Sequence, residues 1–490
     1  MPENNLIYAS PESLGISSRS ILGFLEDMKT YKIPLHSYLV LRHGKVAAEG
    51  YCAPFDADRK HRMYSISKSF TSVAIGMLVT EGRLSVGDKV ADFFPEYIPE
   101  NPTPYMFKAT VRDLLMMAVF NETGAYDWDT PDWVKCFFDN DMPKQMPGTV
   151  FHYDTNATVV LCAIVEKMTG MKLLDYMRPL LDELGISKDI WCVESPDGRS
   201  WTGSGILCTP RDLARFGLFC LNRGEWNGKQ LVDRQYMMEA TTKQIGNYVA
   251  HSGIRTCGYG YQFWMQPEGG FSCSGMGSQY ALMYPEQDLV VITTADAQGL
   301  NNAEDFIRES FLKNILHGCK PEALPEDPAA QAELAEASVL KLPKIEGELT
   351  SPWVEKVNGV KYVFDENRWG FKWMKLDFDA EKVTLTYEKR GETGSFPLYL
   401  GEYGPEFAFP ELDFSTRIGT ADTHYRCVSQ GAWDMENTLV GTVYSVDDFL
   451  GAIKIQFTFV EDTMTIFATK WAENFFNDWR GYLPGHAVKE

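Results

Sequence analysis

The sequence has 490 residues, of which 44% are hydrophobic and 23% charged, and its formal net charge is -21 at pH 7. This acidic excess repels phosphate groups, and no basic run or basic amphipathic helix is present, so we expect neither nucleic acid nor a membrane as a partner. The N-terminus shows no positive region followed by an apolar core, and no apolar run is long enough to cross a bilayer.

The first 82 residues predict a helix, a β-hairpin and a second helix. A helix within residues 11–31 would be capped by Ser17 or Ser18. Alternating apolar residues at 37–51 predict a hairpin. Apolar residues then recur at helical spacing over 70–78, which indicates a buried helix.

Between residues 84 and 320 helical patterns alternate with shorter extended ones. The expected elements are, in order, a capped helix start at Thr110, helices at 157–168, 173–184 and 210–222, strands at 258–264, 271–284 and 289–295, and a helix at 301–316.

Residues 121–150 are rich in Asp, Pro and aromatic residues and predict a long irregular segment, a kind of loop that often carries function. Two interpretations of its aromatic side chains stay open: they wall a substrate cleft, or they only pack the loop. We expect substrate specificity to depend on this segment and on 244–270. The aromatic residues concerned are Tyr126, Trp128, Trp133 and Phe137.

The composition changes after residue 320. Proline, alanine and glutamate predict a linker at 321–347, so the first domain would cover 1–320. Short alternating strands separated by turn residues then predict a smaller all-β domain at 348–490, either a sandwich or a lipocalin-like barrel. We see no catalytic constellation in it.

Ten cysteines are scattered along the chain, several of them inside apolar runs. This pattern indicates reduced thiols in the core of a cytoplasmic protein. No cluster of histidine and cysteine has zinc spacing, and no nucleotide-binding loop is found. We therefore expect neither a metal nor another cofactor.

The chemistry of the chain is expected to centre on Ser65 and Lys68, a Ser-x-x-Lys sequence at the start of the second helix. Side chains three residues apart lie on nearly the same helix face. A serine hydroxyl becomes a nucleophile when a base takes its proton, and a lysine can be that base when burial and positive potential lower its pKa. The tetrapeptide is common by chance, so the interpretation depends on further motifs.

Two such motifs follow: residues 153–155 are Tyr-Asp-Thr before a helix, and residues 273–275 are Cys-Ser-Gly on a strand. Together with the flanking stretches 209–217 and 285–291, they make residues 11–316 resemble the serine β-lactamase and penicillin-binding-protein superfamily, in its class C-like branch of esterases, amidases and peptidases. The resemblance implies an α+β fold, with an antiparallel sheet flanked by helices and a helical subdomain.

The resemblance also implies roles for individual residues. Ser65 would be the acylated nucleophile, Lys68 its base or proton shuttle, and Tyr153 the group that relays a proton to the leaving group and helps to activate the deacylating water. The backbone N–H groups of Ser65 and Met276 would form the oxyanion hole. The remaining substrate-binding positions implied are Thr155, Ser274, Gly275 and Gly277.

Two positions depart from the family pattern. Thr155 replaces an amide side chain that helps to hold the lysine, although its hydroxyl can still form hydrogen bonds. Cys273 replaces the lysine or histidine that binds a substrate carboxylate. A neutral thiol gives up that contact, which argues against efficient β-lactamase action and against a peptidase that anchors its substrate by a carboxylate.

We therefore expect a serine hydrolase that cleaves a small-molecule ester or amide through a Ser65 acyl-enzyme. Two alternatives stay open: a peptidase acting on D-amino-acid-containing or peptidoglycan-type peptides, and a catalytically weak binding protein on the same fold. The β-rich domain at 348–490 would cover the mouth of the cleft or mediate assembly into a homo-oligomer.

Overall fold

A computed structural model describes residues 6–121, 130–139, 144–249, 257–412, 424–471 and 476–488. The chain divides into two compact units, Met1–Lys341 and Leu342–Glu490.

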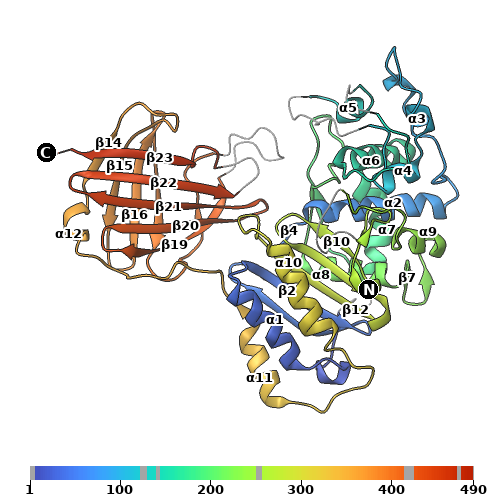
Figure 1. Cartoon of the computed structure of the whole chain (residues 1–490), viewed down its shortest axis with the longest axis horizontal. Helices are drawn as coiled ribbons and strands as arrows, with labels where there is room; N and C mark the ends of the chain where they lie inside the picture. The colour runs from blue at the N-terminus through green and yellow to red at the C-terminus, as the bar shows by residue number, and fades with distance from the viewer. Residues whose placement is uncertain are drawn as a thin grey trace. The chain divides into compact units, whose positions relative to one another are not determined.

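The first unit is built on a mixed, mainly antiparallel sheet of eight strands (Figure 1). Along the sheet the order is β1-β3-β2-β12-β11-β10-β9, and β13 also pairs with β3. The strands are β1 (Ile7–Tyr8), β2 (Leu35–Arg42), β3 (Lys45–Cys52), β9 (Trp264–Met265), β10 (Phe271–Gly275), β11 (Gln279–Tyr284), β12 (Leu289–Ala295) and β13 (Val339–Leu340).

Helices cover both faces of this sheet. Alternate residues of its central strands, such as Tyr38, Val40 and Val291, pack on one side against α1 (Ser18–Thr30), α10 (Ala303–Ser310), the π-helical Phe311–Leu316 and α11 (Pro328–Ala337). On the other side α8 (Pro210–Leu221) lies so close that Gly217 faces Val290. Behind it lies α2 (Ser67–Thr80), where Phe70 stacks on Phe216 with 3.8 Å between ring centroids.

Shorter elements complete the unit. The caps predicted at Ser17 and Thr110 are present: the Ser17 side chain accepts the N–H of Arg19, and Thr110 forms a reciprocal capping box. Thr209, which was not predicted as a cap, forms a second capping box at the start of α8. The remaining elements are α3 (Val90–Phe93), α4 (Val111–Leu115), α5 (Trp133–Asp139), α6 (Thr155–Thr169), α7 (Leu173–Leu184), α9 (Arg234–Ala240), β4 (His61–Arg62), β5 (Trp191–Cys192), β6 (Ile206–Cys208), β7 (Glu225–Trp226) and β8 (Lys229–Gln230).

The structure differs from the sequence prediction around the third motif. The single strand expected at 271–284 is a hairpin, because residues 276–278 form a turn between β10 and β11. Gly277 and Ser278 have φ of 78° and 74°, the left-handed backbone that such a turn needs. The strand expected at 258–264 contracts to β9, and only isolated bridges precede it.

The stretch expected to be a linker, 321–347, is partly folded. Within it α11 buries Leu334 in the core of the first unit, and β13 pairs with β3 in parallel, with Val339 opposite Tyr51. The first unit therefore extends to Lys341.

The second unit is a nearly closed antiparallel barrel-like sheet of ten strands, in the order β17-β16-β15-β14-β23-β22-β21-β20-β19-β18 (Figure 1). The bridge between Leu400 and Gly431 brings the end of β17 back to β19. The elements are α12 (Val354–Val357), β14 (Lys361–Phe364), β15 (Phe371–Phe378), β16 (Lys382–Lys389), β17 (Glu392–Tyr399), β18 (Phe407–Ala408), β19 (Arg426–Met435), β20 (Thr438–Val446), β21 (Leu450–Val460), β22 (Thr463–Trp471) and β23 (Gly481–Ala487).

Inside this barrel a polar cluster sits among aromatic rings. The buried ammonium of Lys389 pairs with Glu411 and with Asp478, and Glu411 also accepts from the Tyr387 hydroxyl and the Trp479 indole.

The two units together confirm the predicted α+β class, and the all-β domain is barrel-like. Among the described residues no helix has both the length and the apolar character needed to cross a bilayer.

Candidate active site

Ser65 lies in a 3₁₀ turn, Tyr64–Ile66, that runs directly into α2. The residue before it, Tyr64, is buried and has a left-handed backbone with φ of 48°. A non-glycine residue in this conformation is held by its surroundings. The turn presents the Ser65 side chain, which is only partly buried, at the beginning of the helix.

Lys68 is on the first turn of α2, and its side chain is 1% exposed. Its Nζ donates to Ser65 Oγ over 3.0 Å and to the main-chain oxygen of Gly203 over 2.5 Å. The amine is thereby fixed between the serine hydroxyl and one carbonyl. The Ser65–Lys68 contact inferred from the sequence is present in the structure.

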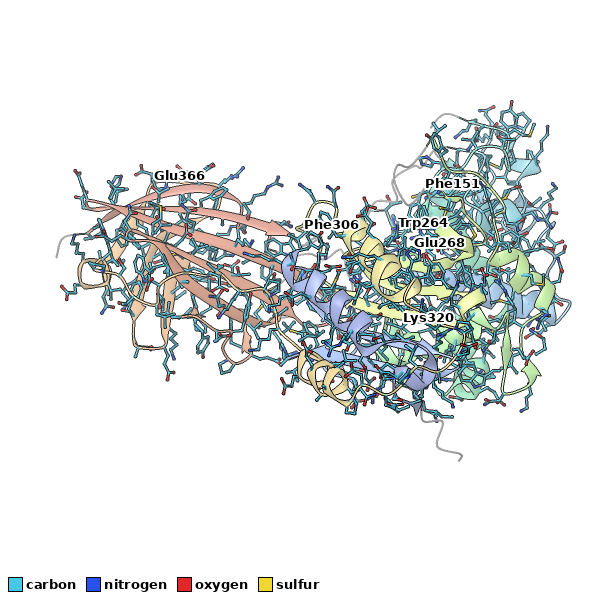
Figure 2. The ribbon with its side chains drawn as sticks, turned by 60° about the horizontal axis from the view of Figure 1, so that its bottom comes forward. Phe151, Trp264, Glu268, Phe306, Lys320 and Glu366 are labelled. Carbon is cyan, nitrogen blue, oxygen red and sulfur yellow. The ribbon has the colours of Figure 1, made fainter. Side chains whose placement is uncertain are left out.

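Tyr153 lies immediately before α6, on the same side of the site. Lys68 Nζ is 5.1 Å from the centroid of the Tyr153 ring. That ring stacks on Trp264, with 5.3 Å between centroids, and meets Tyr259 edge-on at 6.4 Å. Phe151 lies against the same tryptophan at 6.0 Å (Figure 2). An aromatic cluster therefore holds the predicted third catalytic residue beside the lysine.

Asp154 begins α6 as its N-cap, with its carboxylate accepting the N–H of Asn156 over 2.8 Å. Complete burial raises the pKa of Asp154 to about 6, against the opposing effects of the helix N–H groups and the charge of Lys68. Asp154 is the middle residue of the second motif, for which the sequence predicted no role. The structure places a titrating carboxyl group close to the lysine.

The third motif packs against the serine turn. A Cβ atom on Gly275 would collide with the main-chain oxygen of Met63, so only glycine permits this approach. Met276 follows at the start of the turn and is 38% exposed. The Gln279 side chain fixes that turn by donating to the Met276 carbonyl at 2.9 Å and to the Ala295 carbonyl at 2.6 Å.

The other two residues of the third motif face opposite sides of β10. Cys273 is buried, and burial raises the pKa of its thiol to about 12, so it is a neutral thiol at physiological pH. Ser274 is partly exposed, and its hydroxyl accepts from Arg308 Nη2 over 3.3 Å. Nε and Nη1 of the buried Arg308 have no hydrogen-bond partner within the described part of the chain.

Gly203 is a site residue that the sequence analysis did not single out. Its carbonyl accepts the Lys68 amine, and a Cβ on it would collide with the methyl group of Thr155. Thr155, the position where the family has an amide, thus packs against the residue that holds the lysine. The pair of glycines around Ser204 was the only signal in the sequence, because a main-chain carbonyl leaves no side-chain signature.

Part of the 121–150 segment is folded. Trp133 and Phe137 are on α5 and buried, and Trp133 packs edge-on against Trp201. The side chains of Trp133 and Phe137 therefore belong to the packed interior of the first unit. Tyr126 and Trp128 lie outside the described residues.

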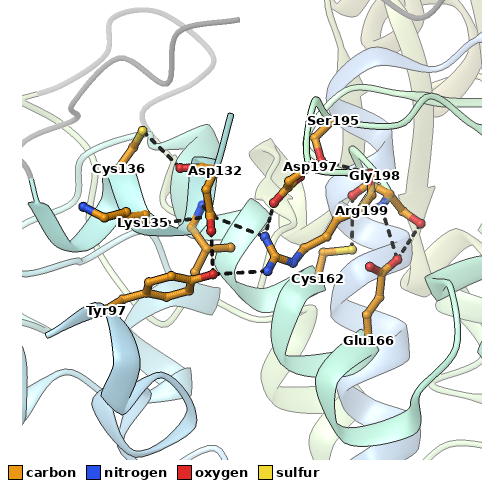
Figure 3. Close-up of polar contacts among 12 residues, drawn as sticks. Tyr97, Asp132, Lys135, Cys136, Cys162, Glu166, Ser195, Asp197, Gly198 and Arg199 are labelled. Atoms are coloured by element: carbon orange, nitrogen blue, oxygen red, sulfur yellow. Dashed lines mark hydrogen bonds and ion pairs between the residues drawn. The ribbon is translucent and has the colours of Figure 1, made fainter. Parts of the chain in front are cut away.

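A polar network next to α5 joins three parts of the helical subdomain (Figure 3). Arg199 pairs with Asp197 and with Asp132, and the Tyr97 hydroxyl donates to Asp132 over 2.5 Å. The network anchors the chain that leads through Trp201 to Gly203.

Comparison with known proteins identifies the family. A family model described as Beta-lactamase matches residues 24–309, more than half of the chain. The chain belongs to the Beta-lactamase family. It is therefore a serine hydrolase by family, as the sequence motifs predicted.

The chain is also similar to two named proteins and to one solved structure. The 6-aminohexanoate-dimer hydrolase of Paenarthrobacter ureafaciens is 26% identical over 283 residues, which cover 52% of this chain and 71% of that protein. The mitochondrial serine beta-lactamase-like protein LACTB of Homo sapiens is 31% identical over 104 residues, 16% of this chain and 19% of that protein. A solved structure from Bacillus anthracis, assigned as a 6-aminohexanoate-dimer hydrolase, shares the fold with a TM-score of 0.54 and 20% identity, covering 66% of this chain and 89% of that one.

Proposed function

We propose that this Beta-lactamase family member hydrolyses a small amide or ester through an acyl-enzyme on Ser65. The observation that carries the proposal is the position of the Lys68 amine, 3.0 Å from Ser65 Oγ and anchored on the Gly203 carbonyl. A neutral amine held there can take the hydroxyl proton as the oxygen attacks.

The proposed reaction has two halves. In the first, the Ser65 oxygen bonds to the substrate carbonyl carbon while its proton passes to Lys68, and the N–H groups of Ser65 and Met276 bind the resulting oxyanion. The carbon–nitrogen or carbon–oxygen bond then breaks, and the leaving group takes up a proton through Tyr153. In the second, a water molecule gives a proton to Lys68 and Tyr153 as its oxygen bonds to the acyl carbon. The bond from that carbon to Ser65 then breaks, the Ser65 oxygen takes the proton back, and the acid is released.

The third motif and one relative direct the proposal towards amides and esters other than β-lactams. Cys273 is a neutral buried thiol, so β10 itself offers no cation to a substrate carboxylate at that position. The relative from Paenarthrobacter ureafaciens is named for hydrolysis of a 6-aminohexanoate dimer. We therefore favour a short linear amide as substrate, with small esters as the related class.

One observation favours the alternative of a peptidase. Arg308 contacts Ser274 and has two guanidinium nitrogens without hydrogen-bond partners among the described residues. A guanidinium binds a carboxylate with two parallel hydrogen bonds, so it could replace the cation missing at Cys273. Substrates with a free carboxylate near the scissile bond would use this contact.

A fluorophosphonate probe tests the acyl-enzyme proposal. We expect the natural protein to be labelled at Ser65, located by mass spectrometry of the tryptic peptide. Ser65→Ala should abolish labelling, whereas Ser85→Ala, an exposed serine beyond α2, should leave it unchanged. Absence of labelling in the natural protein would favour the binding-protein alternative.

A substrate series then separates the two enzymatic alternatives. Linear amides of ω-amino acids, short neutral esters, peptides ending in a D-amino acid and the β-lactam nitrocefin would be compared with Ser65→Ala as background. Turnover of nitrocefin at a rate similar to that of the amides would contradict the argument from Cys273.

A further inference from the structure

Arg62 is a buried cation three residues before Ser65, and nothing in the proposed mechanism uses it. It lies on β4 and is 2% exposed. Its guanidinium lies over the Tyr64 ring, 4.5 Å from the centroid, and over the Trp201 ring at 5.1 Å. Its Nε donates to the Ser204 carbonyl over 3.1 Å and its Nη2 to the Ser204 hydroxyl over 3.3 Å.

Two of these contacts are with the chain neighbours of residues that bind the Lys68 amine. Tyr64 precedes Ser65, whose hydroxyl is one acceptor of the lysine amine. Ser204 follows Gly203, whose carbonyl also accepts from the lysine amine. The planar guanidinium of Arg62 therefore connects Tyr64 and Ser204, the neighbours of Ser65 and Gly203, between which the Lys68 amine is held.

The surrounding backbone supports the same connection. Strand β4 pairs with β6, so that Arg62 lies opposite Leu207 and the Met63 N–H donates to the Ile206 carbonyl over 2.9 Å. The Ile206 N–H in turn donates to the hydroxyl of Ser67 over 3.0 Å. The two chain segments are thus joined by main-chain bonds, and the guanidinium fixes their spacing at the lysine.

The chemistry of the side chain matters here. A buried guanidinium is costly to desolvate, and an apolar side chain of the same volume would pack in its place. Only a flat group with several donors can stack on two rings and bond a carbonyl and a hydroxyl at the same time. Tyr64 has a strained, left-handed backbone, and such a turn relaxes when the contacts that hold it are lost. The contact of Arg62 with the Tyr64 ring is one of these contacts.

We infer that Arg62 is a positioning residue of the acyl-transfer site, which sets the spacing between Ser65 Oγ and the Gly203 carbonyl and so keeps the Lys68 amine directed at the serine. The inference rests on the proposed function. Loss of the Arg62 contacts with Tyr64 and Ser204 lets the Lys68 amine follow the Gly203 carbonyl away from the Ser65 hydroxyl. Proton removal from Ser65 then slows, while the walls that bind the substrate stay in place.

The test measures the rate constant for inactivation, kinact, and the binding constant, KI, of a fluorophosphonate between pH 6 and pH 10. The serine oxygen displaces fluoride, which leaves without taking up a proton, so kinact reports the Lys68–Ser65 step separately from Tyr153. Arg62→Met fills the space without hydrogen bonds, and Arg62→Lys keeps the charge without the planar fork.

Arg42→Met is the matched control. Arg42 is also a buried arginine of the first unit, and it donates to the main-chain oxygens of Leu14, Gly15, Gln287 and Lys320, away from the serine turn. Folded protein is quantified by urea unfolding, and rates are expressed per folded molecule.

We expect both Arg62 variants to lower kinact about 10- to 100-fold, as a small misplacement of a catalytic group does, with KI nearly unchanged and a shifted pH profile. Arg42→Met should lower stability and leave kinact unchanged. Equal kinact in the Arg62 and Arg42 variants would overturn the inference, and Arg62→Lys decides the matter if Arg62→Met does not fold. Absence of labelling in the natural protein would instead refute the proposed function, and the positioning role with it.

Discussion

Replacing Asp154 by asparagine should make the first unit more stable at neutral pH, although it removes a charge beside Lys68. The buried carboxyl group has its pKa raised from an ordinary value near 3.8 to about 6, and burial is the largest cause. Asparagine caps a helix about as well as aspartate and cannot ionise. The variant therefore keeps the N-cap of α6 and loses the cost of the buried charge.

The sign follows from proton binding. Between about pH 4 and pH 6 the folded protein keeps a proton on Asp154 that the unfolded chain has released, so the free energy of unfolding falls as pH rises through this window. Two pKa units correspond to about 3 kcal/mol. Asp154→Asn should match the natural protein at pH 4 and exceed its stability by up to about 3 kcal/mol at pH 7.5.

Urea unfolding at pH 4, 5, 6 and 7.5 measures this difference. Asp154 belongs to the first unit, so the unfolding transition of the second unit should stay in place and serve as an internal reference. Asp233→Asn is the matched control, because Asp233 caps α9 in the same way but is exposed to solvent. If the variant is less stable than the natural protein at pH 7.5, attraction between Lys68 and the carboxylate outweighs burial, and the reasoning is wrong.

Three further predictions concern other parts of the chain. Gly275→Ala places a Cβ against a main-chain oxygen, so it should lower the free energy of unfolding by about 1–3 kcal/mol and remove most of the labelling rate. Gly246→Ala, with open space at its Cβ, should leave both unchanged. If the two variants behaved alike in urea unfolding and probe labelling, the packing argument would be contradicted. In steady-state assays, Arg308→Gln should raise KM about tenfold for substrates with a free carboxylate and leave KM for neutral esters unchanged. An equal rise in KM for both kinds of substrate would remove the peptidase alternative. Lys389→Met removes the cation that pairs with Glu411, whereas Asp478 still pairs with Arg390. The variant should destabilise the second unit by about 1–3 kcal/mol in urea while Ser65 labelling persists; an unchanged barrel transition would show that the Lys389 ion pairs contribute nothing.

Local signals in the sequence were sufficient for several helices of the first unit. Ser17 and Thr110 cap their helices as expected, and α6 ends at Gly170 in a left-handed conformation. The Ser65–Lys68 contact needs only helical spacing, so it too could be predicted.

Other features depend on tertiary placement. The turn at 276–278 uses Ser278 in a left-handed conformation, which composition does not indicate, so β10 and β11 were predicted as one strand. Strand β23 contains Pro484 and three glycines or alanines, which weaken the sequence pattern of a strand. The roles of Arg62 and Arg308 could not be predicted from local sequence, because their hydrogen-bond partners Ser204 and Ser274 are more than 30 residues away in the chain.

The two short strands beside β3 bear on where the first unit can be cut. β1 pairs with Lys45 and Val46, and β13 pairs with Tyr51 and Cys52, so segments from the two ends of the unit share one edge of the sheet. An exposed edge invites pairing with another chain. A fragment ending at residue 320 would lose β13 and α11, uncover half of that edge and open the core at Leu334. A fragment ending at Lys341 keeps its own edge protected.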